Sequence, residues 1–465
     1  MDFSTRYAKL NSAQREAVDT IDGPVMVIAG PGTGKTELLS MRTANILRKT
    51  DELPENILCL TFTESGSIAM QKRLRDVIGR DAYNVSIYTF HAFGAEVMSR
   101  YREYFYNGAN FRPADALTVH HILTTILDEL PYDNPLLSRM NGNYTALGDI
   151  TSSISDLKRA GMSVREFTAL LDAVDTTLEQ LQDTITAIFS QRISKSTYDQ
   201  LIEIIPTIKS IEENMPLDTL QPFSEVLLES LVHALEEAAT HPKTTPPLTA
   251  WKRAWLTQDA QGNQVLRATK YQPKLRALAA IYERYLEAMQ TAELIDFDDM
   301  IMQVVHALET HSELRYELQE KYHYIMVDEF QDTNLSQMRI LRSLTNNPVV
   351  EESPNILVVG DDDQAIYGFQ GAEVGNILTF NQLYPSVRRI TLRDNYRSVA
   401  PILTGARDVI TQADERLERL LEGVDKTLTA HMESPDTAAQ VIELPNSHAE
   451  RAWIAHTIAE HISQG

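Results

Sequence analysis

Short apolar runs alternate with amphipathic segments over the first hundred residues of the chain. Residues 25–29, 57–62 and 85–88 have the length and composition of buried strands, and each is followed by apolar positions at helical spacing. Strands that alternate with helices are typical of a parallel sheet with helices on its faces. The pattern therefore predicts an α/β domain in this part of the chain.

The pattern changes at about residue 101 and changes back at about residue 294. Between these positions helical periodicity dominates, and proline and polar residues at 131–135 and 241–247 indicate loops. Strand-like runs return at residues 324–327, 356–359 and 389–392. The simplest account is one α/β sheet that an all-α insertion interrupts. We expect the first domain to comprise residues 1–100 and 290–388, and the insertion to comprise residues 101–289.

Composition limits the class of protein. The 465 residues are too many for one ordinary core, and 43% hydrophobic with 23% charged residues is typical of a soluble globular protein. No apolar run approaches a membrane span and the first residues lack a signal-peptide core, so we expect a cytoplasmic protein. A single cysteine, Cys59, excludes internal disulfides and cysteine-rich metal sites.

The charge balance is acidic. There are 42 Lys and Arg against 65 Asp and Glu, a formal net charge of −23. This balance argues against indiscriminate binding of polyanions, although a local basic groove remains compatible with it.

The run at 25–29 leads into a glycine-rich turn that ends in Gly-Lys-Thr. This is the build of a phosphate-binding loop, although Ala29 stands where the strict pattern has its first glycine. Backbone N–H groups of such a turn converge on phosphate, Lys35 reaches the β and γ oxygens, and the Thr36 hydroxyl holds Mg²⁺. The residues expected to bind a nucleoside triphosphate here are Ala29, Gly30, Pro31, Gly32, Thr33, Gly34, Lys35 and Thr36.

A second strand-like run, at 324–327, ends in Asp328 and Glu329. In a triphosphate site the first acid of such a pair binds Mg²⁺ and the second accepts the proton of the attacking water. Alone, the pair would indicate a solvated turn at a strand end. Beside a phosphate-binding loop, the catalytic interpretation is favoured.

Further short segments accompany the loop and the acid pair. In chain order, the segments are residues 10–18, 29–36, 60–63, 88–91, 295–300, 328–332, 359–368 and 395–398. In this order they resemble the motifs, from the Q motif through motif IV, of the UvrD/Rep family of superfamily 1 helicases. The ordered set is much more specific than any one motif, and the resemblance covers nearly the whole chain.

The resemblance implies a RecA-like P-loop domain and, in residues 389–465, the incomplete start of a second RecA-like domain. It implies an ATP- and Mg²⁺-dependent translocase that moves 3′ to 5′ on single-stranded DNA and separates duplex. Single-stranded DNA and single-strand/duplex junctions would be its partners, with repair or recombination proteins as further candidates.

It also implies roles for particular residues. Lys35, Glu329, Gln364 and Arg397 would be catalytic, with Gln364 sensing the γ-phosphate and Arg397 acting as an arginine finger. Gln14 would contact adenine, Tyr396 would stack on it, and Thr36 and Asp328 would bind the metal. The residues expected to contact DNA are Phe62, Thr63, His91, Tyr367 and Phe369. A core or strand-end role for His91 is an equal alternative.

Some positions depart from the family pattern. Glu37 stands where relatives often have an arginine that packs on adenine, so one adenine contact is in question. Glu64 places an acid beside an expected phosphate contact, and Gln370 replaces a frequent arginine. Motifs V and VI are absent, and we expect these residues to be part of a longer protein or the product of a split or decayed gene. The alternatives are the motor part of a helicase–nuclease and a non-catalytic ATP-binding DNA clamp or regulatory partner.

Residues 241–276 are locally basic. Aromatic residues are interleaved with the cations, and Asp259 is the only acid there. The cations are Lys243, Lys252, Arg253, Arg267, Lys270, Lys274 and Arg276. One interpretation is a DNA contact. The equal alternative is a solvated helix pair with Trp255 in its core.

Overall fold

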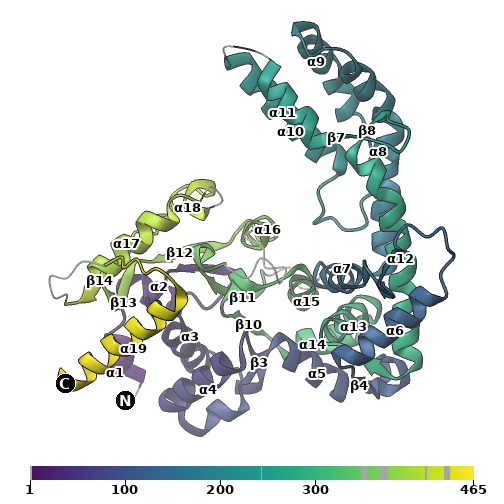
Figure 1. Cartoon of the computed structure of the whole chain (residues 1–465). Coiled ribbons are helices and arrows are strands. Elements are labelled where there is room, and N and C mark those ends of the chain that lie inside the picture. Colours follow the sequence, from purple (N-terminus) through teal and green to yellow (C-terminus); the bar gives the residue numbers. More distant parts are fainter. Residues whose placement is uncertain are drawn as a thin grey trace.

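The computed structural model describes residues 3–241, 243, 245–347, 353–365, 375–413, 416–433 and 440–464. A six-stranded sheet lies at its centre, helices project from one side of it, and a two-stranded sheet lies on the other side (Figure 1). The two ends of the chain lie close together in this view.

The central sheet is parallel throughout and has the order β12-β1-β11-β10-β2-β3. Its strands are β1 (Val25–Ala29), β2 (Ile57–Thr61), β3 (Ser86–Thr89), β10 (Tyr324–Val327), β11 (Asn355–Gly360) and β12 (Arg388–Leu392). Because all strands run the same way, the segments that follow β1, β10 and β11 meet at one edge. Ligands bind at this edge in open α/β sheets.

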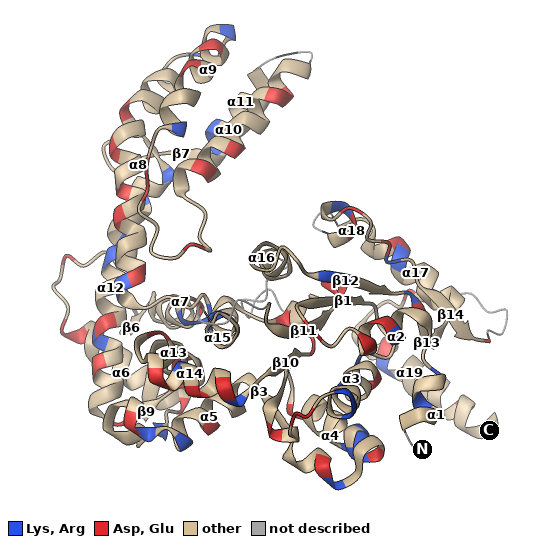
Figure 2. Cartoon of the chain, turned by 180° about the vertical axis from the view of Figure 1, so that it is seen from behind, with Lys and Arg blue, Asp and Glu red and all other residues tan. Residues whose placement is uncertain are grey.

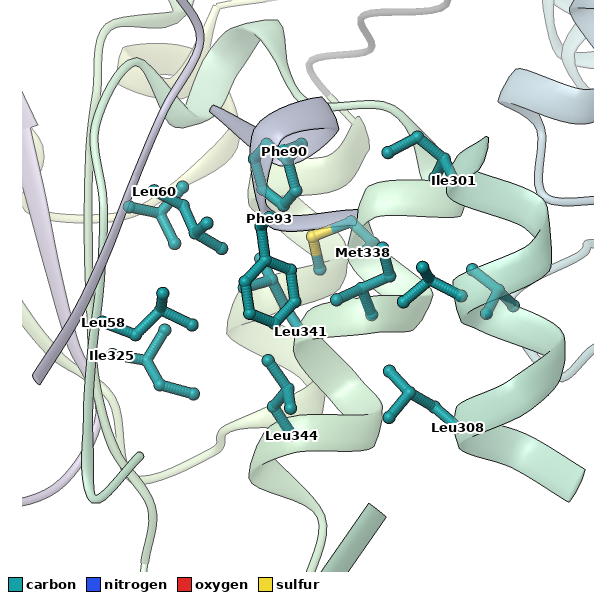
Figure 3. Packing of buried hydrophobic residues seen from close by; sticks show 14 of the residues in the cluster. Leu58, Leu60, Phe90, Phe93, Ile301, Leu308, Ile325, Met338, Leu341 and Leu344 are labelled. Carbon is teal, nitrogen blue, oxygen red and sulfur yellow. The ribbon is translucent and has the colours of Figure 1, made fainter. Parts of the chain in front are cut away.

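Alternate strand residues enter two different cores. On one face, Val25, Val27 and Cys59 pack against α1 to α4. On the other, Leu58, Leu60 and Ile325 pack against Phe90 and Phe93 of α5 and against α13 to α15 (Figure 3). The helices around the sheet are α1 (Phe3–Ala8), α2 (Ser12–Asp19), α3 (Lys35–Lys49), α4 (Glu64–Ile78), α5 (Phe90–Arg100), α13 (Phe297–Thr310), α14 (Ser312–Lys321), α15 (Leu335–Thr345) and α16 (Gly375–Leu383).

The predicted α/β fold class is confirmed, and the six predicted strands occur within one residue of their expected positions. The boundary expected after residue 388 falls inside the sheet, because β12 pairs with β1 from Arg388 to Leu392. The first sheet therefore continues through Leu392.

The insertion contains two hydrophobic cores. One, around Tyr282 and Leu127, lies near the sheet domain, and the other, around Leu227 and Phe189, lies in an arm formed by α8 to α11 (Figure 1). The helices are α6 (Ala116–Asp128), α7 (Leu147–Arg159), α8 (Val164–Ser190), α9 (Lys195–Lys209), α10 (Phe223–Thr240), α11 (Thr245–Trp255) and α12 (Arg267–Thr291).

The insertion differs from the prediction in two details. It includes the antiparallel pairs β5 (Arg139–Met140) with β6 (Asn143–Tyr144) and β7 (Leu256–Gln258) with β8 (Gln264–Leu266), and β4 (Arg112–Pro113) pairs with β9 (Leu294–Ile295) where the insertion leaves and rejoins the sheet domain. In addition, α11 begins at Thr245, within the predicted loop. Pro246 and Pro247 are compatible with its first turn because the N–H groups there need no intrahelical partner.

A smaller unit follows the sheet. It contains the parallel pair β13 (Asp394–Val399) and β14 (Thr429–Met432), with α17 (Ala400–Ile410), α18 (Leu417–Leu420) and α19 (Ser447–Gln464). The described parts of α17 and α19 bury no side chain. Within the described ranges, we find no helix whose length and apolar character would allow it to span a membrane.

Cys59 offers a probe of sheet integrity. Its side chain is 1% exposed in β2, and burial raises the pKa of its thiol to about 12. Because the thiolate is the reactive form, we expect the native protein to resist an aromatic disulfide reagent at pH 8, and the protein in denaturant to react with one equivalent. Absorbance of the released thiolate measures this. Rapid stoichiometric reaction of the native protein would contradict the buried position of β2.

Candidate functional site

The glycine-rich turn connects β1 to α3 at the carboxyl edge of the sheet. Gly32 and Gly34 have φ values of +71° and +88°, which side chains rarely adopt. The Thr33 hydroxyl donates to the Gly30 carbonyl at 2.7 Å, and Gln14 Nε2 donates to the Thr33 carbonyl at 2.8 Å. Hydrogen bonds within the loop and from Gln14 of α2 therefore stabilise the loop, and α3 begins directly after it.

Lys35, the first residue of α3, forms an ion pair with Glu329 beyond β10. Glu329 adopts a left-handed conformation with φ of 49°. Asp328 is buried beside it and accepts a hydrogen bond from the Glu329 backbone at 3.0 Å. Burial and repulsion from Glu329 raise the pKa of Asp328 to about 6, although Lys35 opposes this shift. The sheet therefore unites a cation and two carboxylates that are about 300 positions apart in the chain.

Gln331 connects this pair to the end of β11. Its Nε2 donates to Glu329 Oε2 at 2.9 Å, and its Oε1 accepts from the Asp361 backbone N–H at 2.9 Å. Gln364 Nε2 in turn donates to Asp361 Oδ2 at 2.7 Å. The predicted water activator and the predicted γ-phosphate sensor are therefore joined by one hydrogen-bonded chain.

The segment around Arg397 lies against the glycine-rich turn. The Tyr396 backbone N–H donates to the Gly32 carbonyl at 2.9 Å, and Asn395 Nδ2 donates to the Pro31 carbonyl. Asn395 is fully buried, and its Oδ1 accepts from the Arg397 backbone at 2.9 Å. The Arg397 side chain is exposed and forms no ion pair with the residues that the structure describes.

Tyr396 is flanked by the side chain that caps α2, Asn11, and by one from β14. Asn11 Nδ2 donates to Asp394 Oδ2 at 2.7 Å and to the Tyr396 hydroxyl at 3.3 Å. The Tyr396 ring stacks on His431 with ring centroids 4.9 Å apart.

The Gln14 side chain is buried, and both its amide oxygen and its amide nitrogen already have hydrogen-bond partners. Only 5% of it is exposed, and its Oε1 accepts from the Asn11 backbone at 3.1 Å while its Nε2 is bound to Thr33. A base that contacts Gln14 would have to exchange one of these hydrogen bonds.

Glu37 forms ion pairs with arginines of two neighbouring helices. Its carboxylate is 3.1 Å from Arg6 in α1 and 3.4 Å from Arg73 in α4. The Glu37 carboxylate therefore lies between two arginines.

The residues at this edge fit a hydrated Mg²⁺ bound with phosphate. Mg²⁺ prefers oxygen ligands and usually takes few from the protein, which matches Asp328 and the Thr36 hydroxyl. A buried oxygen of Asp332, Oδ1, has no hydrogen-bond partner, and burial raises the pKa of that carboxyl to about 6. No group of three or more His, Cys, Asp or Glu side chains in the described ranges could hold a metal by itself.

The residues predicted to contact DNA are only partly placed. Thr63 caps α4 and is exposed, with its hydroxyl accepting from the Gly66 backbone at 3.0 Å, and Phe62 before it is half-buried. His91 is half-buried in α5, with its ring edge-on to Phe297 at 5.8 Å, and burial lowers its pKa. Tyr367 and Phe369 lie outside the described residues.

Two of the three aromatic residues in the basic segment, Trp251 and Trp255, pack in the arm's core, whereas Tyr271 is 47% exposed. Trp251 stacks on Phe189 and Trp255, and Lys252 donates to the Phe189 carbonyl at 2.7 Å. Arg276 pairs with two aspartates of α8. Acidic and basic residues are interspersed along the arm (Figure 2). The core interpretation holds for both tryptophans, while Arg253, Lys270 and Lys274 are exposed.

Sequence reasoning did not single out Phe297. This side chain is 71% exposed and lines a cavity of about 920 Å³ between the insertion and the sheet domain. Lys158, which is buried against Asp296 and Asp299 at 2.6 Å each, lines the same cavity. On sequence grounds Phe297 was included only as part of the segment 295–300, and the local signal is an aromatic residue between acids at a helix start.

The close packing of Gly32 against Asn395 and Arg397 allows a test of the contact between the loop and the segment after β12. A Cβ there would lie 2.7 Å from both Arg397 Cβ and Asn395 Nδ2, whereas Gly262 has a similar φ of +87° with nothing within 4 Å. We expect Gly32→Ala to cost roughly 1–3 kcal/mol and to accelerate hydrogen exchange at 396–398, because the segment must move away. Gly262→Ala, the matched control, should leave that exchange unchanged. Equal exchange in both variants would argue against the contact.

Comparison with known proteins agrees with this arrangement. The family model of the UvrD/REP helicase N-terminal domain matches residues 10–385. The ATP-dependent DNA helicase PcrA of Staphylococcus epidermidis is 28% identical over 407 residues, and that of Staphylococcus aureus is 27% identical over the same length. Each match covers 88% of this chain and 40% of the relative, so the chain spans about two-fifths of the relatives' length. On this evidence the chain belongs to the UvrD/REP helicase family.

Proposed function

We propose that this chain is the ATP-binding part of an ATP-driven DNA translocase that moves 3′ to 5′ and unwinds duplex. The proposal rests on one observation. Lys35 forms an ion pair with Glu329 at the sheet edge, and hydrogen bonds through Gln331 and Asp361 connect Glu329 to Gln364. Phosphoryl transfer requires charge stabilisation and a positioned water rather than covalent participation of the protein. These side chains are suited to that task.

The Lys35–Glu329 pair suggests how phosphate would prepare the site. The phosphates of ATP carry more negative charge than one carboxylate, so Lys35 would turn from Glu329 towards them. Glu329 Oε2 would then be free to accept a proton from the attacking water. Gln331, bound to the same oxygen at 2.9 Å, would keep the carboxylate oriented.

Mg²⁺ would neutralise charge on the phosphate oxygens. Thr36 and Asp328 are the residues proposed to hold it. Burial raises the pKa of Asp328 to about 6, which is still below neutral pH, so the carboxyl is mostly ionised there and is available to a cation.

The segment after β12 would contribute the remaining contacts. The Tyr396 ring is proposed to stack on adenine. The Arg397 backbone N–H donates to Asn395, and the preceding residue, Tyr396, donates to the loop carbonyl of Gly32. An arginine at the γ-phosphate contributes on the order of 10³ to 10⁵ in rate in related phosphoryl-transfer enzymes. We propose Arg397 for this role.

Single-stranded DNA is the proposed track, with strand–duplex junctions as the substrate. Phe62, Thr63 and His91 follow β2 and β3 at the same edge as the phosphate loop, which favours coupling between nucleotide and DNA. Stacking on aromatic rings tolerates every base, as a motor requires. Repair or recombination proteins stay candidate partners.

Two other functions remain open. A helicase–nuclease would use the same motor residues. A non-catalytic clamp would bind nucleotide without turnover, but the position of Arg397 against the phosphate loop and the pairing of Glu329 with Lys35 favour hydrolysis. We further propose that the 465 residues alone bind nucleotide yet show little DNA-stimulated turnover and no unwinding, because motif VI is needed. ATPase assays with and without DNA, on this chain and on one extended through motif VI, test this.

Substitutions at the ion pair separate binding from chemistry. Lys35→Ala should remove detectable Mg·ATP binding, because it deletes the cation for the phosphates. Glu329→Gln should retain binding but lose hydrolysis at least a hundredfold in the extended protein, because only the proton acceptor is lost. Fluorescent-nucleotide titration and phosphate release measure these effects, with Lys49→Ala as an exposed control. Wild-type turnover by Lys35→Ala would refute the site.

The exposed cations of the arm provide a test of DNA binding. Replacing Arg253, Lys270 and Lys274 with Ala should flatten the salt dependence of single-strand binding by about 0.7 for each phosphate that the variant no longer neutralises. The triple variant Arg192→Ala, Lys195→Ala, Lys209→Ala removes the same charge from exposed positions around α9 and should change the slope less. Equal slopes in the two variants would assign the segment to ordinary solvated surface.

A further inference from the structure

Three consecutive aspartates follow β11, and one lysine pairs with all of them. Lys426 Nζ lies 2.7 Å from Asp361, 2.5 Å from Asp362 and 2.8 Å from Asp363. An ammonium group has three N–H donors, so each carboxylate can receive one. Lys426 is 7% exposed, and it comes from the segment just before β14 rather than from the sheet domain.

Other groups from the same segment support this arrangement. Arg416 donates to both oxygens of Asp363, at 2.8 and 2.7 Å, and to Glu418 at 2.9 Å. The Leu417 backbone N–H donates to Asp362 Oδ2 at 2.9 Å. Each of the three aspartates is therefore bound from across the junction between the sheet domain and the smaller unit.

The positive charge of Lys426 offsets repulsion among the three neighbouring carboxylates. Burial alone lowers the pKa of Lys426, but the carboxylates of Asp361 and Asp362 outweigh it and raise that pKa. Without the lysine, adjacent carboxylates would repel one another in a setting with little water. The backbone of residues 361–363 would then have to move to separate the carboxylates.

Such a movement would reach Gln364 directly. Its amide is bound to Asp361 Oδ2, while Lys426 is paired with the other oxygen, Oδ1. Gln364 and Lys426 line one cavity of about 280 Å³ together with Gly30 and Pro31 of the phosphate loop. The amide is thus oriented beside the loop by a carboxylate that the lysine holds in place.

We propose that Lys426 is a positioning residue that acts through Asp361 to fix the Gln364 amide for recognition of the γ-phosphate. This inference rests on the proposed function, because it takes the loop to be an ATP site. It adds a residue from the smaller unit that no motif contains, and it makes discrimination between ATP and ADP depend on contact between the two units.

Nucleotide binding to the whole chain tests the inference without requiring turnover. ADP and a non-hydrolysable ATP analogue, each with Mg²⁺, are titrated against wild type, Lys426→Met, Gln364→Ala and the double variant. We expect wild type to prefer the ATP analogue, and Lys426→Met to lose roughly tenfold of that preference with ADP affinity unchanged. Because Lys426 acts through Gln364, the double variant should lose no more than Gln364→Ala alone.

Matched variants separate positioning from general damage. Asp425→Asn removes a charge next to Lys426, from an exposed pair with Arg393, and should keep the wild-type preference. Lys426→Arg should retain part of it, because the charge remains. If Lys426→Met does not fold, Asp362→Asn/Lys426→Met removes one charge of each sign and should show the same loss.

The outcomes are distinct. Failure of wild type to bind either nucleotide would refute the proposed function itself. Equal wild-type affinity for both nucleotides, an unchanged preference in Lys426→Met or in its folded double variant, or additive losses in the Gln364 background would each overturn the role of Lys426.

Discussion

Parallel pairing of β1 with β11, and of β11 with β10, holds the candidate site together. The register places Val27 beside Val359 and Met326 beside Leu357, so the three strands end at the same edge. A slip of one residue would turn every side chain to the opposite face and exchange the two cores. The positions of the phosphate loop, the acid pair and the aspartate run all follow from this register.

The second constraint is the contact between the sheet edge and the chain that leaves it. Asn395 and Tyr396 bind loop carbonyls, and Lys426 binds the aspartate run. These contacts are polar and directional, unlike the apolar packing inside the sheet domain. Apolar packing is also present at this junction, because Leu417 of α18 is buried in the core of the sheet domain. The polar contacts are directional and therefore favour defined relative positions of the two units.

The sequence was informative where the signal is local. Buried central strands such as β1 are continuous apolar runs, and the phosphate loop needs particular residues in a short span, so both could be predicted. The short strands of the insertion could not be predicted, because two or three residues show no periodicity. The tryptophans at 251 and 255 were ambiguous because a spacing of four suits both a core and an exposed face.

Side-chain partners were also beyond prediction from sequence. The hydrogen bond from Gln14 in α2 to the Thr33 carbonyl of the phosphate loop depends on backbone geometry. Lys426 lies more than 60 positions from the aspartates that it neutralises. The sequence pattern counted the run at 389–392 among the strands of the sheet, although the boundary expected at residue 388 separated this run from the first domain. The pairing of β12 with β1 places the run in the sheet.

The strand order has a consequence for synthesis of the protein on the ribosome. β1 and β2 are not neighbours: β11 and β10, which follow the insertion, lie between them. When β1 to β3 emerge, the centre of their sheet does not yet exist, and their apolar faces must wait while the helical arm is translated. The arm has a core of its own and can fold during that interval, whereas the first strands cannot complete their sheet. This places a long-lived aggregation hazard at the N-terminal side of the chain and makes early chaperone contact advantageous there.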